Sequence, residues 1–171
     1  TSNAASRRSP HIATRRRRRS STDRRVARSG NTDTWAALVP ELLVSDLDAS
    51  LAFWCGLLRF RVRFDRPEHR FAYLELGPAQ VMLEQHGDRS WITGPLERPL
   101  GRGINLQITV ADVTSLNARL VAAGIEPYRA LAVAWYRDGD IEHGQAQLLV
   151  QDPDGYLLRF CQGVGQRPVR R

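Results

Sequence analysis

Glu84 and His86 form the pair best suited to metal or acid–base chemistry in this chain. They lie two positions apart in the stretch QVMLEQHG, which places both on one side of an extended strand. A carboxylate and an imidazole held this way could supply two ligands to a divalent ion. A histidine at the end of a strand is, however, more often a solvated rim residue. The pair makes a metal site only if further ligands join it.

The remaining histidines and the cysteines do not extend this site. His11, His69 and His143 are far apart, in an arm, a turn and a long connection. Cys55 and Cys161 have no metal-like spacing, and we expect two free, buried thiols in a reducing cytoplasm. The sequence contains neither a Gly-x-Ser-x-Gly nucleophile motif nor a glycine-rich phosphate loop.

Aromatic side chains in polar segments point instead to binding. Trp91, Trp135 and Tyr136 lie in such segments, and acidic residues cluster around them: Asp88, Glu97, Asp138, Asp140 and Glu142. Exposed tryptophan forgoes the benefit of burying a large ring, so each ring needs a partner. One interpretation is packing on the domain or on a partner subunit. The other is stacking on a flat or cationic ligand, with the acids supplying complementary charge.

Charge divides the chain into an arm, a domain and a tail. Residues 1–34 hold ten arginines and two aspartates, a net charge of +8, with too few apolar residues to fold. We expect a disordered arm whose opening, TSNA, is typical of a tag remnant and whose remainder reflects an over-extended start or a solvated segment. Residues 35–164 hold twelve arginines and sixteen acids, a net charge of −4, and 165–171 form a basic tail. Nucleic-acid binding is therefore expected only through the arm.

No apolar run approaches the roughly 18 residues of a membrane helix, so we predict a soluble cytoplasmic protein that does not bind membranes. Hydrophobic periodicity predicts one domain made of two βαβββ modules, residues 35–86 and 104–162, joined by a loop at 87–103. Helices are predicted at 45–58, capped by Ser45 or Asp46, and at 111–124, ended by Gly124.

The two modules repeat each other along the sequence. The stretch 44–47 (VSDL) matches 110–113 (VADV) at an offset of 66 residues, and the turn at Gly77-Pro78 matches Asp152-Pro153 at an offset of 75. The extra residues are assigned to a long loop at 132–144 in the second module. The fold class is therefore α+β, with cupped, mixed or antiparallel sheets and helices outside.

These motifs resemble a known superfamily. Paired βαβββ modules, with VSDLDASLAFW opening the first and VQDPDGYLLRF closing the second, are similar to the vicinal oxygen chelate superfamily of glyoxalases, extradiol dioxygenases and bleomycin-resistance proteins. The resemblance implies four cup-facing positions that hold a metal ion in the enzymes. Here they are Val39, Glu84, Asn105 and Arg159. Valine offers no donor and arginine stays protonated, so we predict no metal, no cofactor and no catalytic residue.

The branch implied most closely is that of the bleomycin-resistance proteins. It predicts a non-catalytic homodimer that sequesters a bulky, cationic antibiotic in a groove between subunits. The alternative is a lyase or dioxygenase of the same superfamily with an unrecognised metal site. Strand alternation and the aromatic segments give the predicted ligand-binding residues: Glu41, Met82, Glu84, Trp91, Asn105, Gln107, Trp135, Tyr136 and Arg159. We also predict that Arg159 pairs with Glu84 across the cup.

Overall fold

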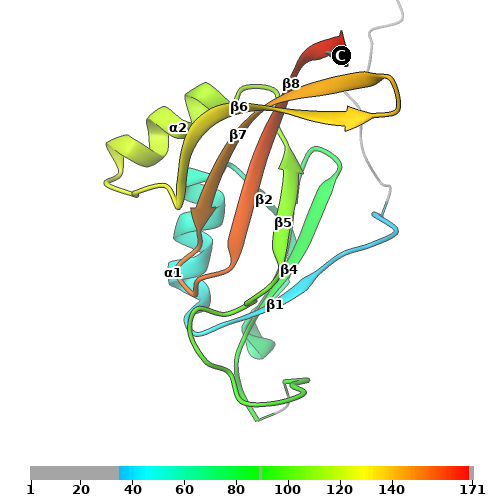
Figure 1. Cartoon of the computed structure of the whole chain (residues 1–171). Helices are drawn as coiled ribbons and strands as arrows, with labels where there is room; N and C mark the ends of the chain where they lie inside the picture. The colour runs from blue at the N-terminus through cyan, green and yellow to red at the C-terminus, as the bar shows by residue number, and fades with distance from the viewer. Residues whose placement is uncertain (1–34, 89, 170–171) are drawn as a thin grey trace, which may run out of the picture. The chain divides into compact units, whose positions relative to one another are not determined.

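Eight strands form two four-stranded sheets, one in each half of the domain (Figure 1). The structure, a computed structural model, describes residues 35–88 and 90–169, so the predictions for the 1–34 arm lie outside it. The first sheet has the order β1-β4-β3-β2 and the second β5-β8-β7-β6. The strands are β1 Glu41–Val44, β2 Arg61–Arg66, β3 Phe71–Leu76, β4 Ala79–Gln85, β5 Asn105–Thr109, β6 Arg129–Asp138, β7 Ile141–Gln151 and β8 Leu157–Pro168. The predicted duplicated α+β fold is confirmed.

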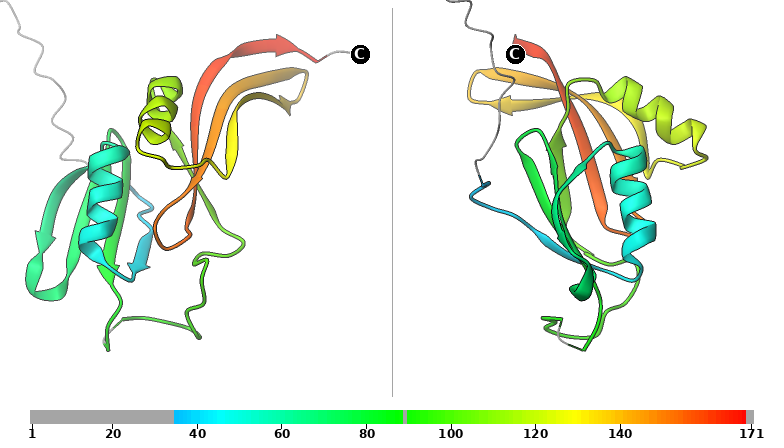
Figure 2. Two further views of the ribbon diagram at one scale, coloured as in Figure 1. Left: turned by 90° about the vertical axis from the view of Figure 1, so that its left-hand side faces the viewer. Right: turned by 180° about the vertical axis from the view of Figure 1, so that it is seen from behind.

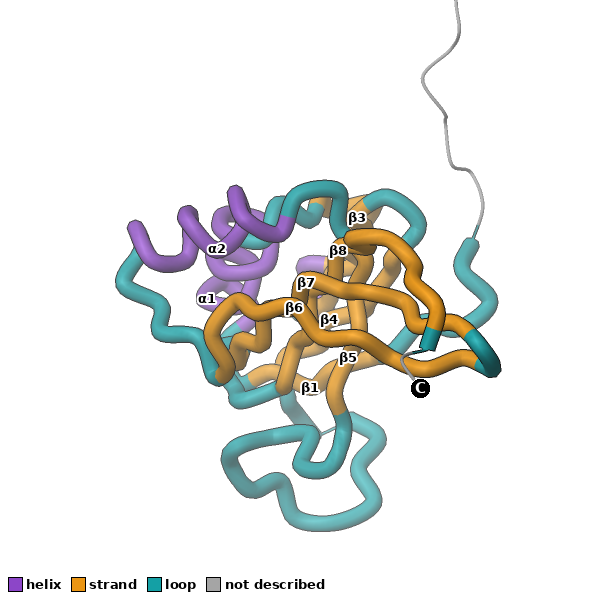
Figure 3. Tube along the Cα trace, turned by 45° about the horizontal axis from the view of Figure 1, so that its top comes forward, coloured by secondary structure: helices purple, strands orange, loops and turns teal. Residues whose placement is uncertain are grey.

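Each module pairs its first strand in parallel with its last strand. β1 lies parallel to β4 and β5 lies parallel to β8, whereas the other neighbouring strands are antiparallel. A parallel pair needs a crossover connection, and in both modules a helix provides it. The connection between β4 and β5 has no helix or strand among its described residues and forms the long loop seen in Figure 3.

Aspartates start both helices, as the sequence predicts. Asp46 accepts hydrogen bonds from the N–H groups of Asp48 and Ala49 at the start of α1 (Leu47–Leu51), which continues as a π-helix at Ala52–Leu57. Asp112 accepts from the N–H of Ser115 at the start of α2 (Val113–Ala122). These side-chain acceptors satisfy N–H groups that have no partner within the helix.

One face of each sheet packs with the helices in a continuous apolar core. Leu42 and Val44 on β1 and Leu158 and Phe160 on β8 are buried in it, as is Trp54 of the first helix. Because side chains alternate along a strand, the residues between them face the other way. Figure 2 shows α1 covering one face of the first sheet, which leaves the opposite face for a site.

The turn between β7 and β8 fastens the two modules together. Asp152 accepts a hydrogen bond of 3.3 Å from the indole N–H of Trp54, and Asp154 accepts one of 2.9 Å from the backbone N–H of Ser45. Arg98 pairs with Asp154 at 2.5 Å. Burial raises the pKa of Asp152, and the hydrogen bonds that it accepts lower it by less. The aspartates of the Asp-Pro-Asp-Gly turn therefore have a structural role. We call the contacts of Asp152 and Asp154 with Trp54, Ser45 and Arg98 the module latch.

The second module departs from the sequence prediction in its hairpin. The segment 132–144, predicted as a loop, instead forms the outer half of the hairpin of β6 and β7. There Trp135 pairs with Gly144, and Asp138 pairs with Ile141. β8 likewise runs to Pro168, beyond the predicted end of the module at 162, because it pairs with β7 over its whole length. The β-branched and aromatic residues Val133, Trp135 and Tyr136 favour an extended strand, which explains why this segment forms a hairpin rather than a loop. No described helix combines the length and the apolar character needed to cross a membrane.

Candidate functional site

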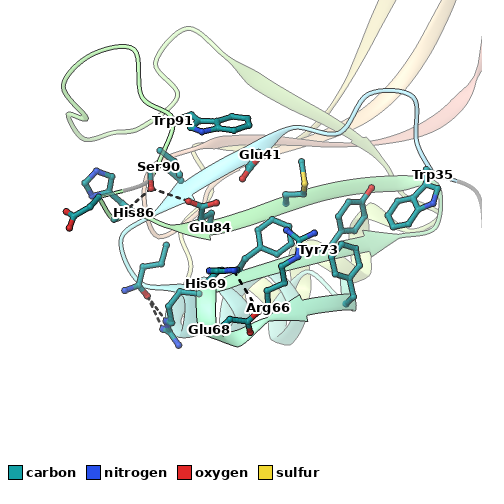
Figure 4. A pocket seen from close by; sticks show the side chains of 18 residues that line it. Trp35, Glu41, Arg66, Glu68, His69, Tyr73, Glu84, His86, Ser90 and Trp91 are labelled. Carbon is teal, nitrogen blue, oxygen red and sulfur yellow. Dashed lines mark hydrogen bonds and ion pairs between the residues drawn. The ribbon is translucent and has the colours of Figure 1, made fainter.

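The face of the first sheet opposite its helix carries two rows of side chains. Cross-strand pairing sets one row as Glu41, Met82, Tyr73 and Phe64, and the next as Leu43, Glu84, Phe71 and Arg66. All eight line a hollow of about 1130 Å³, which we call the cup (Figure 4). The hollow has an aromatic floor with acids toward one end and an arginine at the sheet edge.

Two tryptophans form opposite walls of the cup. Trp91, in the loop after β4, lines the hollow while its side chain is 94% exposed. Trp35 lies at the other end, with its ring centroid 5.2 Å from that of Tyr73 and 6.0 Å from that of Phe64. The Arg63 guanidinium stacks on the Trp35 ring at 4.0 Å. Trp35 is thus held in place by its neighbours, whereas Trp91 presents a free ring surface of the kind that stacks on ligands.

Glu41 and Glu84 place two carboxyl groups at the same end of the cup. The pKa of Glu41 is raised, first by burial and then by its hydrogen bond to Glu84 and by the like charge of that residue, while Arg66 lowers it. Glu84 also accepts a hydrogen bond of 3.2 Å from the hydroxyl of Ser90. Two carboxyl groups in contact retain a proton more readily than isolated ones. The pair can accept hydrogen bonds from a ligand or balance a cation.

The predicted residues of the second module do not reach this cup. Asn105 and Gln107 line a smaller groove of about 350 Å³, and Arg159 donates a hydrogen bond to Gln107. The predicted ion pair between Glu84 and Arg159 is wrong for a single chain: the described residues contain no such contact. Glu84 lies in the cup on the first sheet, whereas Arg159 lies beside Gln107 on the second sheet, so positions related by the repeat belong to different sheets.

Trp135 and Tyr136 also lie outside the cup. Trp135 is on β6, where its ring packs beneath the Arg167 guanidinium at 4.0 Å and over the backbone of Gly144. Tyr136 faces the other side of the hairpin and donates a hydrogen bond of 2.8 Å to Gln147. The Trp135 ring therefore packs against its own domain, which agrees with the interpretation that the tryptophans in polar segments pack on the protein.

The side chains present do not suit the divalent ion that many superfamily enzymes carry. Val39 has no donor atom, and Arg159 would place a cation at a ligand position. Among the described residues, no three His, Cys, Asp or Glu side chains lie close enough together to hold a metal ion. His86 lines the cup but makes with Glu84 at most a two-ligand set. The described residues of one chain therefore fall short of the three protein ligands that a divalent site of this kind needs.

Sequence reasoning missed part of the cup. Trp35, Phe64, Arg66 and Ser90 line it, yet none was predicted to bind ligand. Phe64 and Arg66 follow a break in the alternation, because β2 has a register shift between Val62 and Phe64. A β-bulge of this kind reorients the following side chains and is not visible in a two-residue pattern. Trp35 carries no strand signal at all, since it precedes β1.

Comparisons with known proteins fit this geometry. The family model of the Glyoxalase/Bleomycin resistance protein/Dioxygenase superfamily matches residues 35–160. A superfamily member from Vibrio splendidus 12B01 is 37% identical over 72% of this chain and 95% of its own, with a TM-score of 0.30. The match of the family model over residues 35–160 shows that the chain belongs to this superfamily.

More distant solved structures share the fold. TioX from Micromonospora sp. ML1 is 23% identical, with a TM-score of 0.58 over 74% of this chain and 98% of its own. Virulence protein STM3117 from Salmonella typhimurium is 20% identical, with a TM-score of 0.56 over 77% and 98%. No functionally curated protein gives a significant match. At this level of identity the likeness concerns the fold and not the ligand.

Proposed function

We propose that this member of the superfamily is a non-catalytic cytoplasmic binding protein that sequesters a bulky, flat-ringed cationic antibiotic of the bleomycin type. The observation that carries the proposal is the cup, with its aromatic floor, its exposed Trp91 and its Glu41–Glu84 pair. Aromatic rings favour a flat or cationic ligand, and adjacent carboxyl groups favour its positive charge. The volume of about 1130 Å³ accommodates a large molecule.

The proposal includes a homodimer that completes the site. In one chain the described walls of the cup come from residues 35–91, and the side facing away from the first sheet is open. Asn105 and Gln107 of the second module are exposed, in the smaller groove that residues near Pro40 and Pro78 also line. A second copy that lays this part of the second module over the cup would supply the amide wall that the site lacks. Closure by a two-fold axis would create two equivalent sites.

A titration with metal-free and copper-loaded bleomycin, followed by tryptophan fluorescence, tests the proposal. Quenching that saturates at micromolar ligand supports it, because Trp91 lies at the cup. No change up to about a millimolar, a standard free energy weaker than about −4 kcal/mol, removes drugs of this type. Light scattering at micromolar protein tests the assembly, and a monomer near the chain mass of 19.3 kDa would contradict it.

A further inference from the structure

Arg66 brings a positive charge into a cup that otherwise favours cations. It ends β2, at the edge of the first sheet, and its guanidinium carbon lies 4.8 Å from the ring centroid of Phe71 and 5.5 Å from that of Phe64. Figure 4 shows its side chain on the same side of the sheet as Glu41 and Glu84. A guanidinium resting on rings keeps its N–H edge free for a ligand.

Neighbouring arginines form close ion pairs with acids, whereas Arg66 acts on Glu41 through its charge without forming such a pair. Arg61 pairs with Glu75 at 2.8 Å, and Arg70 pairs with Asp48 at 2.9 Å. Among the described residues, no carboxylate lies within 4.0 Å of the Arg66 guanidinium. Ring contacts with Phe64 and Phe71 hold this side chain in place, and no close ion pair with a described residue occupies its N–H groups. Its five N–H donors form a fork that matches a carboxylate or a similar planar anion.

The spacing between the charges sets the size of the ligand. Glu84, Phe71 and Arg66 are direct neighbours in one row across β4, β3 and β2. Adjacent strands lie about 4.8 Å apart, so the backbones at Glu84 and Arg66, two strands apart, are separated by about 10 Å. Phe71 lies between the two charges and offers a flat surface. An aromatic ring system stacked on Phe71 could carry a cationic group toward the acids and an anionic group toward Arg66.

We propose that Arg66 is an anion subsite and that the ligand is an aromatic zwitterion, with its anionic and cationic groups on opposite sides of a flat ring system. The inference rests on the proposed function, which places the ring and the cation in the cup, and it adds the anion. It also makes Arg66 a residue that determines specificity. A purely cationic aromatic would leave Arg66 facing its positive charge without compensation.

Three probes that share a naphthalene ring test this inference by isothermal titration calorimetry. They are 6-(aminomethyl)-2-naphthoic acid, a zwitterion; 2-(aminomethyl)naphthalene, a cation; and 2-naphthoic acid, an anion. The zwitterion should bind about tenfold more tightly than the cation, as expected for one charge-assisted pair. Arg66→Gln should abolish this ratio and leave the affinity for the cation unchanged or higher. Arg66→Lys should retain part of the ratio.

Arg59→Gln is the matched control, because Arg59 is exposed just before β2, does not line the cup and carries the same charge. It should keep the full preference for the zwitterion. Equal binding of the zwitterion and the cation, or a preference that survives Arg66→Gln, overturns the anion subsite and leaves the proposed function standing. Failure of all three probes up to millimolar concentration argues against ring binding in the cup, and both proposals fall together.

Discussion

Glu41 and Glu84 lie on adjacent parallel strands, two residues out of register, and both side chains line the cup. Glu41 is opposite Met82, and Glu84 is opposite Leu43. Burial and the like charge of Glu84 raise the pKa of Glu41, so this carboxyl group retains its proton more readily than an isolated one. Proton uptake and ligand binding therefore compete at this end of the cup.

Replacing Glu41 with Gln should change stability in a pH-dependent way. The raised pKa means that the folded protein holds the Glu41 proton at pH values where the unfolded chain has lost it. The contribution of Glu41 to stability therefore falls as the pH rises from its ordinary pKa through the raised one. Glu41→Gln should raise the melting temperature at pH 7 and leave it unchanged at pH 3. Thermal unfolding of Glu126→Gln, at an exposed loop carboxylate, provides the control. A lower melting temperature at pH 7 would argue against a disfavoured charge at Glu41.

Trp91→Ala should weaken ligand binding without affecting the fold. Its side chain is 94% exposed, so its removal costs no core packing. Aromatic contacts to a cation contribute on the order of 1–2 kcal/mol, which corresponds to a loss of about tenfold in affinity. Trp135→Ala is the matched comparison, since that ring packs within the hairpin under Arg167. It should lower the melting temperature and leave affinity for bleomycin or the naphthalene probes unchanged. The reverse pattern would place the site on the hairpin.

Gly144→Ala should destabilise the hairpin that holds Trp135. A Cβ at Gly144 would lie 2.7 Å from Cγ2 of Val164 and 2.8 Å from Cη2 of Trp135, closer than atoms can pack. Overpacking of this kind costs about 1–3 kcal/mol. Gly163→Ala, on the neighbouring strand, meets no atom within 4 Å and should be tolerated. Urea unfolding of both variants measures the difference, and equal midpoints would show that the ring does not rest on Gly144.

Asp154→Ala should weaken the module latch. The buried carboxylate accepts from Ser45 and Arg98, and its loss leaves the backbone N–H of Ser45 without that acceptor. Hydrogen bonds to a charged group of this kind contribute about 1.5–3 kcal/mol each. Urea unfolding should show this loss, whereas Glu126→Ala, at the same exposed loop position as before, should not. A shift as small as that of the control would mean that Arg98 and Ser45 find other acceptors.

The sequence predicted features that depend on local chemistry. Asp46 and Asp112 begin helices because aspartate caps free N–H groups, and this preference is visible in the sequence. The faces of Glu41 and Met82 followed from alternation. Arg66 and Trp35 could not be found this way, since a bulge precedes one and no regular strand contains the other. The Glu84–Arg159 pair failed because a repeat in sequence relates positions without saying which faces meet in space.

The module latch also bears on how the domain folds. The two sheets share no strand, yet the turn at residues 152–155 near the end of the chain holds Trp54 and Ser45 of the first half. These contacts span 98 and 109 positions, so they close only once both modules are present. The halves should melt in one cooperative transition, and the first half expressed alone should not reach the stability that it has in the whole domain. The two modules repeat one architecture, and the contacts of the module latch make the stability of each module depend on the other.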